Sequence, residues 1–371
     1  MKNLFYLLAS ALLFFPLIAG AQVQEMQQTS DQATFRGKVI EVIEEREIVE
    51  NGSTFTQQNV KVEIVEGDRN GQILFIQSIS DVIVTNQNVY KKGDHVLVYF
   101  VKDASGSEEY YIVDYVRTNV LAFLLLLFII TVIAVLGRKG IRPLISLFIT
   151  AAMLLYFVVP NIISGRPPVL IASLGALIIM TSAIFITEGW SKKTKVTFIT
   201  VLISLILLVG LSWSFTLLAR LTGIFSEDAF YVMRALNGEI NMQGLLLAGI
   251  IIGTLGVVDD VILTQVSTVY QLAKTNRNLG RKELFAKSME VGRDHIKALV
   301  NTLFLAYMGA AMPLLILFRI HLPPFETFFR VINHELIAIE ITRTLVGSVV
   351  LILAVPIATA LAIREFGKEK A

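Results

Sequence analysis

Between residues 118 and 363 the chain is a succession of long apolar segments that carry few charges. Each is close to the roughly 20 residues that an α-helix needs to cross a bilayer. In lipid, backbone N–H and C=O groups must find their partners within the protein, so these segments are predicted to be helices. We predict seven spans, at residues 118–137, 143–159, 167–187, 196–219, 243–272, 298–318 and 344–363.

The composition divides the chain into two parts that suit two different solvents. Of 371 residues, 54% are hydrophobic and 17% are charged, whereas charged residues make up about 25% of ordinary soluble domains. Charges are dense over residues 22–117 and sparse over residues 118–363. The chain has no cysteine, which excludes disulfides, thiolate metal sites and cysteine nucleophiles. A net charge of +2 gives no argument for nucleic-acid binding.

The first 21 residues have the pattern of a secretory signal peptide. Lys2 precedes an apolar run over residues 4–18, and Ala19, Gly20 and Ala21 form an A-x-A cleavage site. Cleavage after Ala21 is predicted, and an uncleaved anchor is the alternative. Both interpretations place the following residues outside the cytoplasm.

Residues 22–117 are predicted to form a small extracytoplasmic β-domain. From Thr34 to Arg117, β-branched and aromatic residues alternate with polar ones, and turn signals such as Asn51-Gly52, Asn70-Gly71 and Ser105-Gly106 separate the runs. Val82 falls in one of the runs. Five or six short strands favour a closed or half-open β-barrel, and the OB fold is one barrel of this kind. A resemblance to the OB fold does not by itself indicate a function. We expect the domain to act as a cap on the membrane domain or as a docking module for an extracytoplasmic protein partner.

The distribution of basic residues predicts the orientation of the spans. With the β-domain outside, the cytoplasmic stretches carry sixteen Lys and Arg and the outer loops carry six. This bias agrees with the signal peptide, so we predict an extracytoplasmic N-terminal domain and a cytoplasmic C-terminus. The longest cytoplasmic connection, residues 274–297, has apolar residues at helical spacing. It is interpreted as a short amphipathic helix at the membrane surface or as a packed loop.

Two adjacent acids follow an apolar run in the fifth span. Asp259 and Asp260 lie about 22 Å along the helix axis from Gly244, within the inner half of a core of about 30 Å. Carboxylates at that depth are disfavoured by a few kcal/mol and usually face a polar interior. Gly249, Gly253 and Gly256 just before them would permit close packing or a helix break. The alternative is a short, tilted helix with both acids at the cytoplasmic interface.

Three further polar residues are candidates for interactions within the bundle. Asn301, in the sixth span, is expected at a depth similar to that of the two acids, as their hydrogen-bond partner or in a purely structural bond between helices. Glu340 and Arg343 are spaced to pair on one helix face. Because residues 344–363 already suffice to span, we expect this pair at the outer interface.

Catalytic, nucleotide and metal motifs are not found. His334-Glu335 is not a zinc-protease motif because residue 338 is Ala. The chain contains no phosphate-binding G-x-x-x-x-G-K-[ST] sequence. We therefore predict no cofactor, no metal, no nucleic acid and no enzymatic activity.

Four stretches resemble the YibE/F-like family of bacterial membrane proteins. They are Gly253-Thr-Leu-Gly-Val-Val-Asp-Asp260, Glu290-Val-Gly-Arg-Asp294, Asn301-Thr-Leu-Phe-Leu-Ala-Tyr-Met-Gly309 and Glu340-Ile-Thr-Arg-Thr-Leu-Val-Gly347. The resemblance covers most of residues 118–363, with the β-domain in its usual place before them. One departure is Arg277, where a proline is common. The resemblance implies a multi-pass protein of the bacterial cytoplasmic membrane without an assigned biochemical activity.

These observations predict a polytopic α-helical membrane protein with a small N-terminal β-barrel-like domain. The first functional hypothesis is a secondary transporter or channel in which Asp259, Asp260 and Asn301 line a polar site for a cation or proton. The second is a scaffold or accessory subunit whose β-domain binds a partner outside the membrane. The lipid bilayer is the expected environment, and a homo-oligomer is compatible with both hypotheses.

Overall fold

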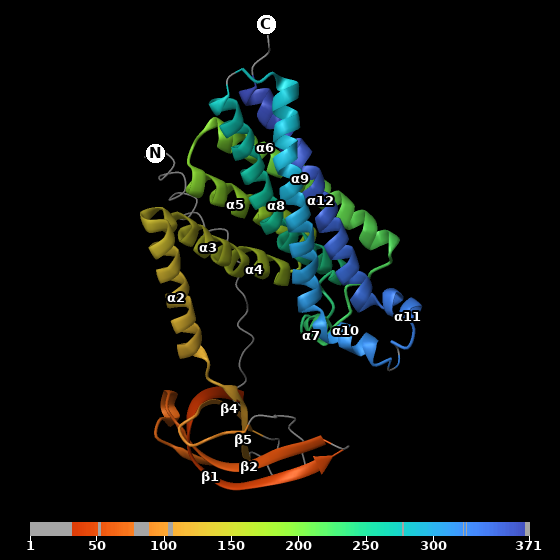
Figure 1. The fold of residues 1–371 in the computed structure, drawn as a ribbon. Coiled ribbons are helices and arrows are strands. Elements are labelled where there is room, and N and C mark those ends of the chain that lie inside the picture. Colours follow the sequence, from red (N-terminus) through yellow and green to blue (C-terminus); the bar gives the residue numbers. More distant parts are fainter. Residues whose placement is uncertain are drawn as a thin grey trace. The chain divides into compact units, whose positions relative to one another are not determined.

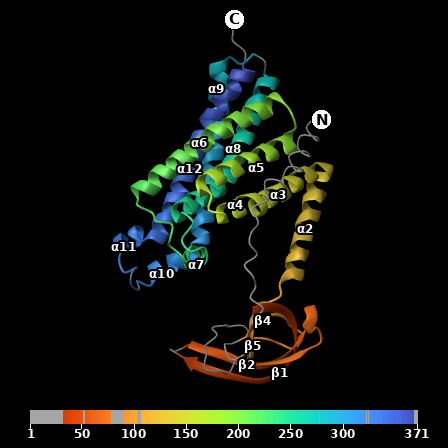
Figure 2. The ribbon, with the colours of Figure 1, turned by 180° about the vertical axis from the view of Figure 1, so that it is seen from behind.

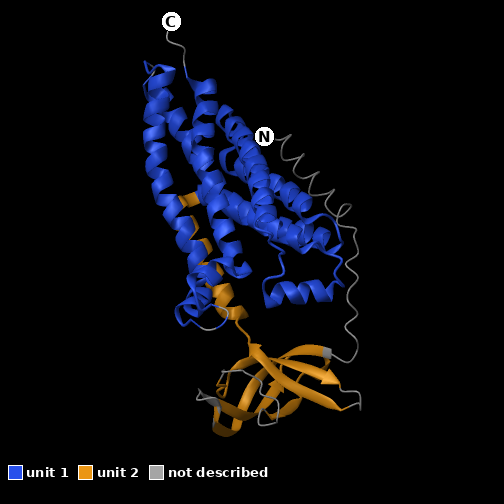
Figure 3. Ribbon diagram, turned by 90° about the vertical axis from the view of Figure 1, so that its right-hand side faces the viewer, with its two compact units in different colours: residues 1–21, 138–371 blue, residues 22–137 orange. Residues whose placement is uncertain are grey.

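The computed structural model describes residues 32–50, 53–77, 89–102, 107–276, 278–321, 323 and 325–367. The predicted signal peptide, Val82 and the turns at Asn51-Gly52 and Ser105-Gly106 lie outside these residues. The chain divides into two compact units, one ending at Gly137 and the other beginning at Arg138 (Figure 3). The first contains the β-sheet and one apolar helix, and the second contains all the other helices.

The first unit contains a five-stranded antiparallel sheet in the order β3-β2-β1-β4-β5. The long β1 joins its two halves: residues 37–50 pair with β2 and residues 32–38 pair with β4 (Figure 1). The strands are β1 (Gln32–Glu50), β2 (Ser53–Ile64), β3 (Ile73–Gln77), β4 (His95–Lys102) and β5 (Glu108–Tyr115). A 3₁₀ turn, η1 (Gly67–Arg69), lies between β2 and β3. The end strands β3 and β5 approach each other, so the sheet curves into a half-barrel.

Alternating side chains fill the inside of this half-barrel, as the period of two in the sequence requires. Val39, Val60, Val62, Val96 and Val98 are completely buried in its core. Helix α2 (Thr118–Leu136) follows the sheet and is apolar along its whole length, and Gly137 ends it at a φ of 58°.

The described residues of the second unit form helices joined by short connections (Figures 1 and 2). Helix α8 lies against α5, α6, α9 and α12, which makes it the central element of the bundle. The core contains apolar side chains from α5, α6, α8 and α12, including Leu208, Val261 and Leu351. The helices of this unit are α3 (Ile141–Met153), the π-turn η3 (Leu154–Val158), α4 (Val159–Ile163), α5 (Pro168–Glu188), α6 (Lys192–Leu218), α7 (Glu227–Ala235), α8 (Met242–Thr275), α9 (Arg281–Ala310), α10 (Met312–Arg319), α11 (Phe328–Asn333) and α12 (Glu335–Phe366). A 3₁₀ turn, η2 (Gly137–Gly140), precedes α3.

Among the described residues, five helical segments are long and apolar enough to cross a membrane, and there are six if the bent pair of α9 and α10 is counted as one span. The first segment, Thr118–Ile163, includes two of the seven predicted spans, because η2 links α2 and α3 without a non-helical gap. The axes of α9 and α10 differ by 71°. Pro313, near the start of α10, has no N–H for a helical hydrogen bond, which accounts for the break in the predicted span 298–318.

The connection 274–297 is neither a separate surface helix nor a loop. Helix α8 continues to Thr275 and α9 begins at Arg281, so residues 281–297 form the first half of α9. Leu284, Ser288 and Gly292 are buried on one face of this half. The helical spacing in the sequence therefore marked a helix that packs within the bundle.

Candidate functional site

The two central acids lie in the middle of α8. The Asn241 side chain accepts a hydrogen bond from the Gly244 N–H at 2.9 Å and caps the start of the helix. Asp260 is 18 residues after Met242 and 15 before Thr275. The helix thus extends about 20 Å or more on either side of the acids, more than half the thickness of a hydrocarbon core.

The two carboxylates point in different directions, because adjacent residues on a helix differ by about 100°. Asp259 is half-buried, and its Oδ1 is buried without a hydrogen-bond partner in the described part of the chain. Asp260 is exposed at the surface of the bundle. One acid therefore borders the interior of the unit while its neighbour faces outward.

Asp260 lies on the same face of α8 as two exposed glycines. Gly253, Gly256 and Asp260 are all exposed and are spaced three and four residues apart, so they share one side of the helix. We call these three residues the open face. A Cβ at Gly256 would have no atom within 4 Å, and one at Gly253 would lie 3.7 Å from the Tyr307 hydroxyl. Helices α5 and α9 flank α8 in Figure 1.

Helix α9 carries His295, which lies within electrostatic range of Asp260. Asn301 is exposed, and among the described residues no hydrogen bond joins it to Asp259 or Asp260. Asp259 and Asp260 are adjacent on α8, and their predicted interaction with Asn301 stays a prediction.

Glu340 and Arg343 form an ion pair within α12. Arg343 Nη1 lies 3.2 Å from Glu340 Oε1, and the side chains are 24% and 16% exposed, respectively. The Arg343 guanidinium also lies 5.9 Å from the centre of the Tyr307 ring of α9. Because α12 begins at Glu335, before the predicted span, the pair stands more than one turn inside the helix and packs against the bundle.

Two hydroxyls near this pair were not singled out by sequence reasoning. Thr254 is 1% exposed and Thr344 is 4% exposed, and neither hydroxyl oxygen has a hydrogen-bond partner in the described structure. A Cβ on Gly347 would lie 3.2 Å from Thr254 Oγ1, so α8 and α12 are in close contact there. The position of Thr254 beside Gly253 was the available signal, but threonines are common in apolar helices.

Gln265 is a second functional candidate that the sequence did not reveal. It is almost fully buried in α8, and its Nε2 donates to the Ser288 carbonyl at 2.9 Å and to Thr359 Oγ1 at 2.7 Å. These bonds connect α8, α9 and α12. An amide in an apolar helix must find such partners, so its position between Val261 and Val269 was a usable signal.

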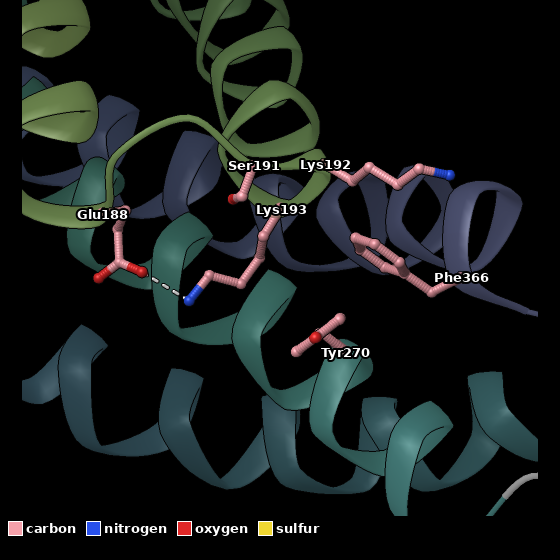
Figure 4. Close-up of a pocket in the computed structure, with 6 residues that line it drawn as sticks. All are labelled: Glu188, Ser191, Lys192, Lys193, Tyr270 and Phe366. Carbon is pink, nitrogen blue, oxygen red and sulfur yellow. Dashed lines mark ion pairs between the residues drawn. The ribbon is translucent and has the colours of Figure 1, made fainter. Parts of the chain in front are cut away.

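A pocket of about 440 Å³ lies where α5, α6, α8 and α12 come together at one end of the bundle. Figure 4 shows its lining residues Glu188, Ser191, Lys192, Lys193, Tyr270 and Phe366. Both lysines are paired: Lys193 Nζ lies 2.6 Å from Glu188 Oε2, and Lys192 Nζ lies 3.1 Å from Glu365 Oε1. Because each cation already has a carboxylate partner, we assign these residues to the packing of the helix ends.

The acids are too dispersed to form a metal centre. Among the described residues, no group of three or more His, Asp or Glu side chains could hold a metal ion. The carboxylates act singly: Asp260 is within electrostatic range of His295, and Glu340 is paired with Arg343, whose guanidinium lies near the Tyr307 ring. Such groups can bind and release protons, or attract a cation one charge at a time.

Comparison with known proteins identifies the family. Searches among curated proteins and among solved structures find no match. The family model described as YibE/F-like protein matches residues 124–368, which include α8, α9 and α12 with all the polar residues described above. The chain is a member of the YibE/F-like family.

Proposed function

We propose that this protein is a non-enzymatic secondary transporter or channel, in which Asp259 and Asp260 form an intramembrane acidic site for a cation or a proton. The observation that carries the proposal is the buried, unpartnered Oδ1 of Asp259 beside the exposed carboxylate of Asp260, both in the middle of an apolar helix. Acids are costly at this depth in lipid, and in membrane proteins they commonly mark ion or proton pathways. The exposed glycines next to Asp260 leave space beside it for water or an ion.

Substitution of the acids tests this function. Asp260→Asn should abolish ion flux in proteoliposomes while membrane abundance stays the same or rises, because a neutral amide costs less to insert in lipid. Asp228→Asn, which removes an exposed acid from α7, is the matched control and should leave flux unchanged. Normal flux in both Asp259→Asn and Asp260→Asn would refute the proposal.

A scaffold function is the second candidate, and the outer surface of the β-domain favours it. Ile73 and Phe75 on the end strand β3 are 62% and 48% exposed. Such apolar side chains suit contact with a protein partner. A photo-crosslinker at Phe75 should capture an extracytoplasmic protein, and Ile73→Ser should reduce the yield. The absence of any crosslinked protein would argue against this function.

We further propose seven spans, with the signal peptide cleaved and the β-domain outside the bacterial cytoplasmic membrane. The sixteen-to-six distribution of basic residues supports this orientation. Reporter fusions after Asn161, Ala229 and His321 should be extracytoplasmic. Fusions after Ser191, Asn278 and the last residue should be cytoplasmic. An extracytoplasmic signal at Asn278 would overturn the seven-span arrangement.

The β-domain is proposed to be an OB-type barrel. The strand order β3-β2-β1-β4-β5, with β1 shared between the two halves and β3 close to β5, supports this assignment. An experimental structure of the domain should show β3 beside β5. A flat sheet with β3 and β5 far apart would exclude an OB barrel.

A further inference from the structure

We propose that the transported ion is the proton, and that it moves along the open face of α8 between Asp260 and the Glu340–Arg343 pair. Tyr307 links the two ends of this route. The inference rests on the transport function proposed above, because it names the ion and the path at the same acidic site. It adds Glu340, Arg343, Tyr307 and His295 to that site.

The first part of the route is the open face itself. Gly253 lies seven residues from Asp260, or about 10 Å along the axis of α8. A Cβ at Gly256, between them, would meet nothing within 4 Å. Bare helix backbone beside a carboxylate leaves room for water molecules, which carry protons between titratable groups.

The second part joins the open face to the ion pair through Tyr307. The hydroxyl of Tyr307 lies 3.7 Å from the Cβ position of Gly253, and its ring lies 5.9 Å from the Arg343 guanidinium. Arg343 in turn contacts Glu340 at 3.2 Å. A phenol accepts one hydrogen bond while it donates another, so Tyr307 can pass a proton and remain neutral.

Unpartnered polar atoms on α8 and α12 provide an independent indication of water at this end. Thr254 Oγ1, Thr344 Oγ1 and Arg343 Nε are all buried, and none has a hydrogen-bond partner among the described residues. Buried polar groups in proteins nearly always pair with protein, water or ligand. Thr254 follows Gly253 on α8, Thr344 follows Arg343 on α12, and Arg343 Nε belongs to the guanidinium that faces the Tyr307 ring, so water molecules at this end would supply the partners that these atoms lack.

The charges at each end fit a proton better than a metal ion. Asp260 has Asp259 beside it on α8 and His295 of α9 within electrostatic range, and Glu340 is paired with Arg343, whose guanidinium lies 5.9 Å from the centre of the Tyr307 ring. Metal cations such as Ca²⁺ take six or more oxygen ligands, and the described residues contain no group of three acidic or histidine side chains for one. A single carboxylate is sufficient to hold a proton.

Each step of the proposed route moves one proton from a donor to an acceptor. Hydronium on one side gives its proton to the Glu340 carboxylate and becomes water. The resulting carboxylic acid returns to carboxylate as its proton passes through water and the Tyr307 hydroxyl to Asp260. Protonated Asp260 then gives the proton to water on the other side and returns to carboxylate, so only O–H bonds form and break.

Proton flux into proteoliposomes of the full-length protein tests the route. A K⁺ diffusion potential set by valinomycin drives the flux, and an internal pH-sensitive dye reports it. Asp260→Asn, Glu340→Gln and Gly256→Leu should each lower the flux at least tenfold, the last by filling the open face. Asp260→Glu retains a carboxyl group and should retain flux. The matched control is Gly249→Leu, because Gly249 is also exposed with nothing within 4 Å of its Cβ but lies one turn beyond the contact with Tyr307.

The outcomes separate this inference from the transport function on which it rests. Proton flux lost in the three route variants and kept in Gly249→Leu and Asp260→Glu supports the route. Tracer flux of Na⁺ or Rb⁺ without proton flux in the wild type overturns the inference and leaves a cation transporter. No flux of any of these ions overturns both. Wild-type proton flux in a well-folded Gly256→Leu or Glu340→Gln variant, judged by a single size-exclusion peak in detergent, shows that the route is wrong.

Discussion

Arg69 and Glu108 form a two-point salt bridge between the two ends of the β-sheet. Arg69 Nη1 lies 3.2 Å from Glu108 Oε2, and Nη2 lies 3.1 Å from Oε1. Arg69 stands in η1, between β2 and β3, and Glu108 begins β5, at the opposite end of the strand order. The same guanidinium lies 4.4 Å from the centre of the Phe100 ring and contacts the Tyr110 hydroxyl. This side chain therefore holds the half-barrel closed.

Residues 22–117 should fold without the helical part of the chain. Among the described residues, the core of the half-barrel consists of side chains from the sheet and its loops, such as Val60 and Tyr90. About 90 residues can bury a sufficient core without disulfides, although with little margin. The fragment should be soluble, with a β-rich circular dichroism spectrum and one cooperative melt. An aggregated or unfolded fragment would show that α2 or other helices complete its core.

Replacing Arg69 should destabilise this domain. Arg69→Ala removes the contact with Phe100 and the salt bridge together, and the cation–π contact alone is worth about 1 kcal/mol in a partly exposed site. For a domain of this size that corresponds to a melting temperature lower by about 4–8 °C. The control is Arg46→Ala, which removes an exposed arginine that is paired with Glu44 on the same strand. This substitution should change the melting temperature little. Equal shifts in both variants would contradict the assigned role of Arg69.

The stability of the domain should depend on pH through Glu108. The hydrogen bond from the Tyr110 hydroxyl, followed by the contact with Arg69, lowers the pKa of Glu108 below its ordinary value of 4.5. A lowered pKa in the folded state stabilises the fold above pH 4.5, and this stabilisation is lost as the pH falls through the folded-state pKa. The melting temperature of the wild type should exceed that of Glu108→Gln at pH 7, and the difference should narrow toward pH 3. A constant difference across this range would show that Glu108 does not titrate as proposed.

Replacing Gly37 with any larger residue should lower the free energy of unfolding of the same domain. A Cβ at this position in β1 would lie 2.3 Å from Val62 Cγ1 and 3.1 Å from Val98 Cγ2, and both valines are completely buried. Gly37→Ala should therefore cost about 1–3 kcal/mol, the usual range for overpacking. Lys38→Ala, on the exposed face next to it, should change stability by less than about 0.5 kcal/mol. Urea unfolding of the fragment measures the stability of both variants. An unfolding midpoint of Gly37→Ala equal to that of the wild type would show that β2 and β4 can move apart from β1 at no cost.

In the helical unit, Gln265 should stabilise the junction of three helices. Gln265→Met keeps much of the volume but removes the donors to Ser288 and Thr359. Interhelical hydrogen bonds in membranes contribute about 1 kcal/mol, so the unfolding midpoint of the purified protein in detergent should fall. Thr264→Ala, at an exposed site beside it, is the control. A midpoint as high as that of the wild type would show that the amide is dispensable.

Hydrophobic periodicity predicted the β-strands and the long apolar helices, but not the short helices α7 and α11 or the ends of the long helices. Alternation predicted the strands around Val60, Val62, Val96 and Val98, because side-chain direction in a strand reverses at every residue. Apolar length predicted the helices, because lipid admits few other backbone structures. It missed the extension of α12 to Glu335, since a helix continues past the membrane core wherever its own hydrogen bonds and packing allow.

The candidate site was predictable only in part. An acid pair within an apolar run is visible in the sequence, and so is the spacing of Glu340 and Arg343, because both depend on residues close together in the chain. Other features of the site depend on contacts between different helices. These are the contacts of Tyr307 with Gly253 and Arg343, the burial of the unpartnered hydroxyls of Thr254 and Thr344, and the hydrogen bonds of Gln265. Such contacts depend on how each helix is rotated about its axis and shifted along its neighbour. The sequence of a single helix does not specify either quantity.

The sequence by itself determined the division into a β-rich part and an apolar helical part, since hydropathy and side-chain period are properties of consecutive residues. It also determined the family, through stretches that are contiguous along the chain. Only the tertiary structure decided that Arg69 closes the half-barrel on Glu108 and that Tyr307 approaches the open face at Gly253. These relationships depend on how folded elements pack in three dimensions, where residues distant in sequence become neighbours through the summed contacts of the whole unit.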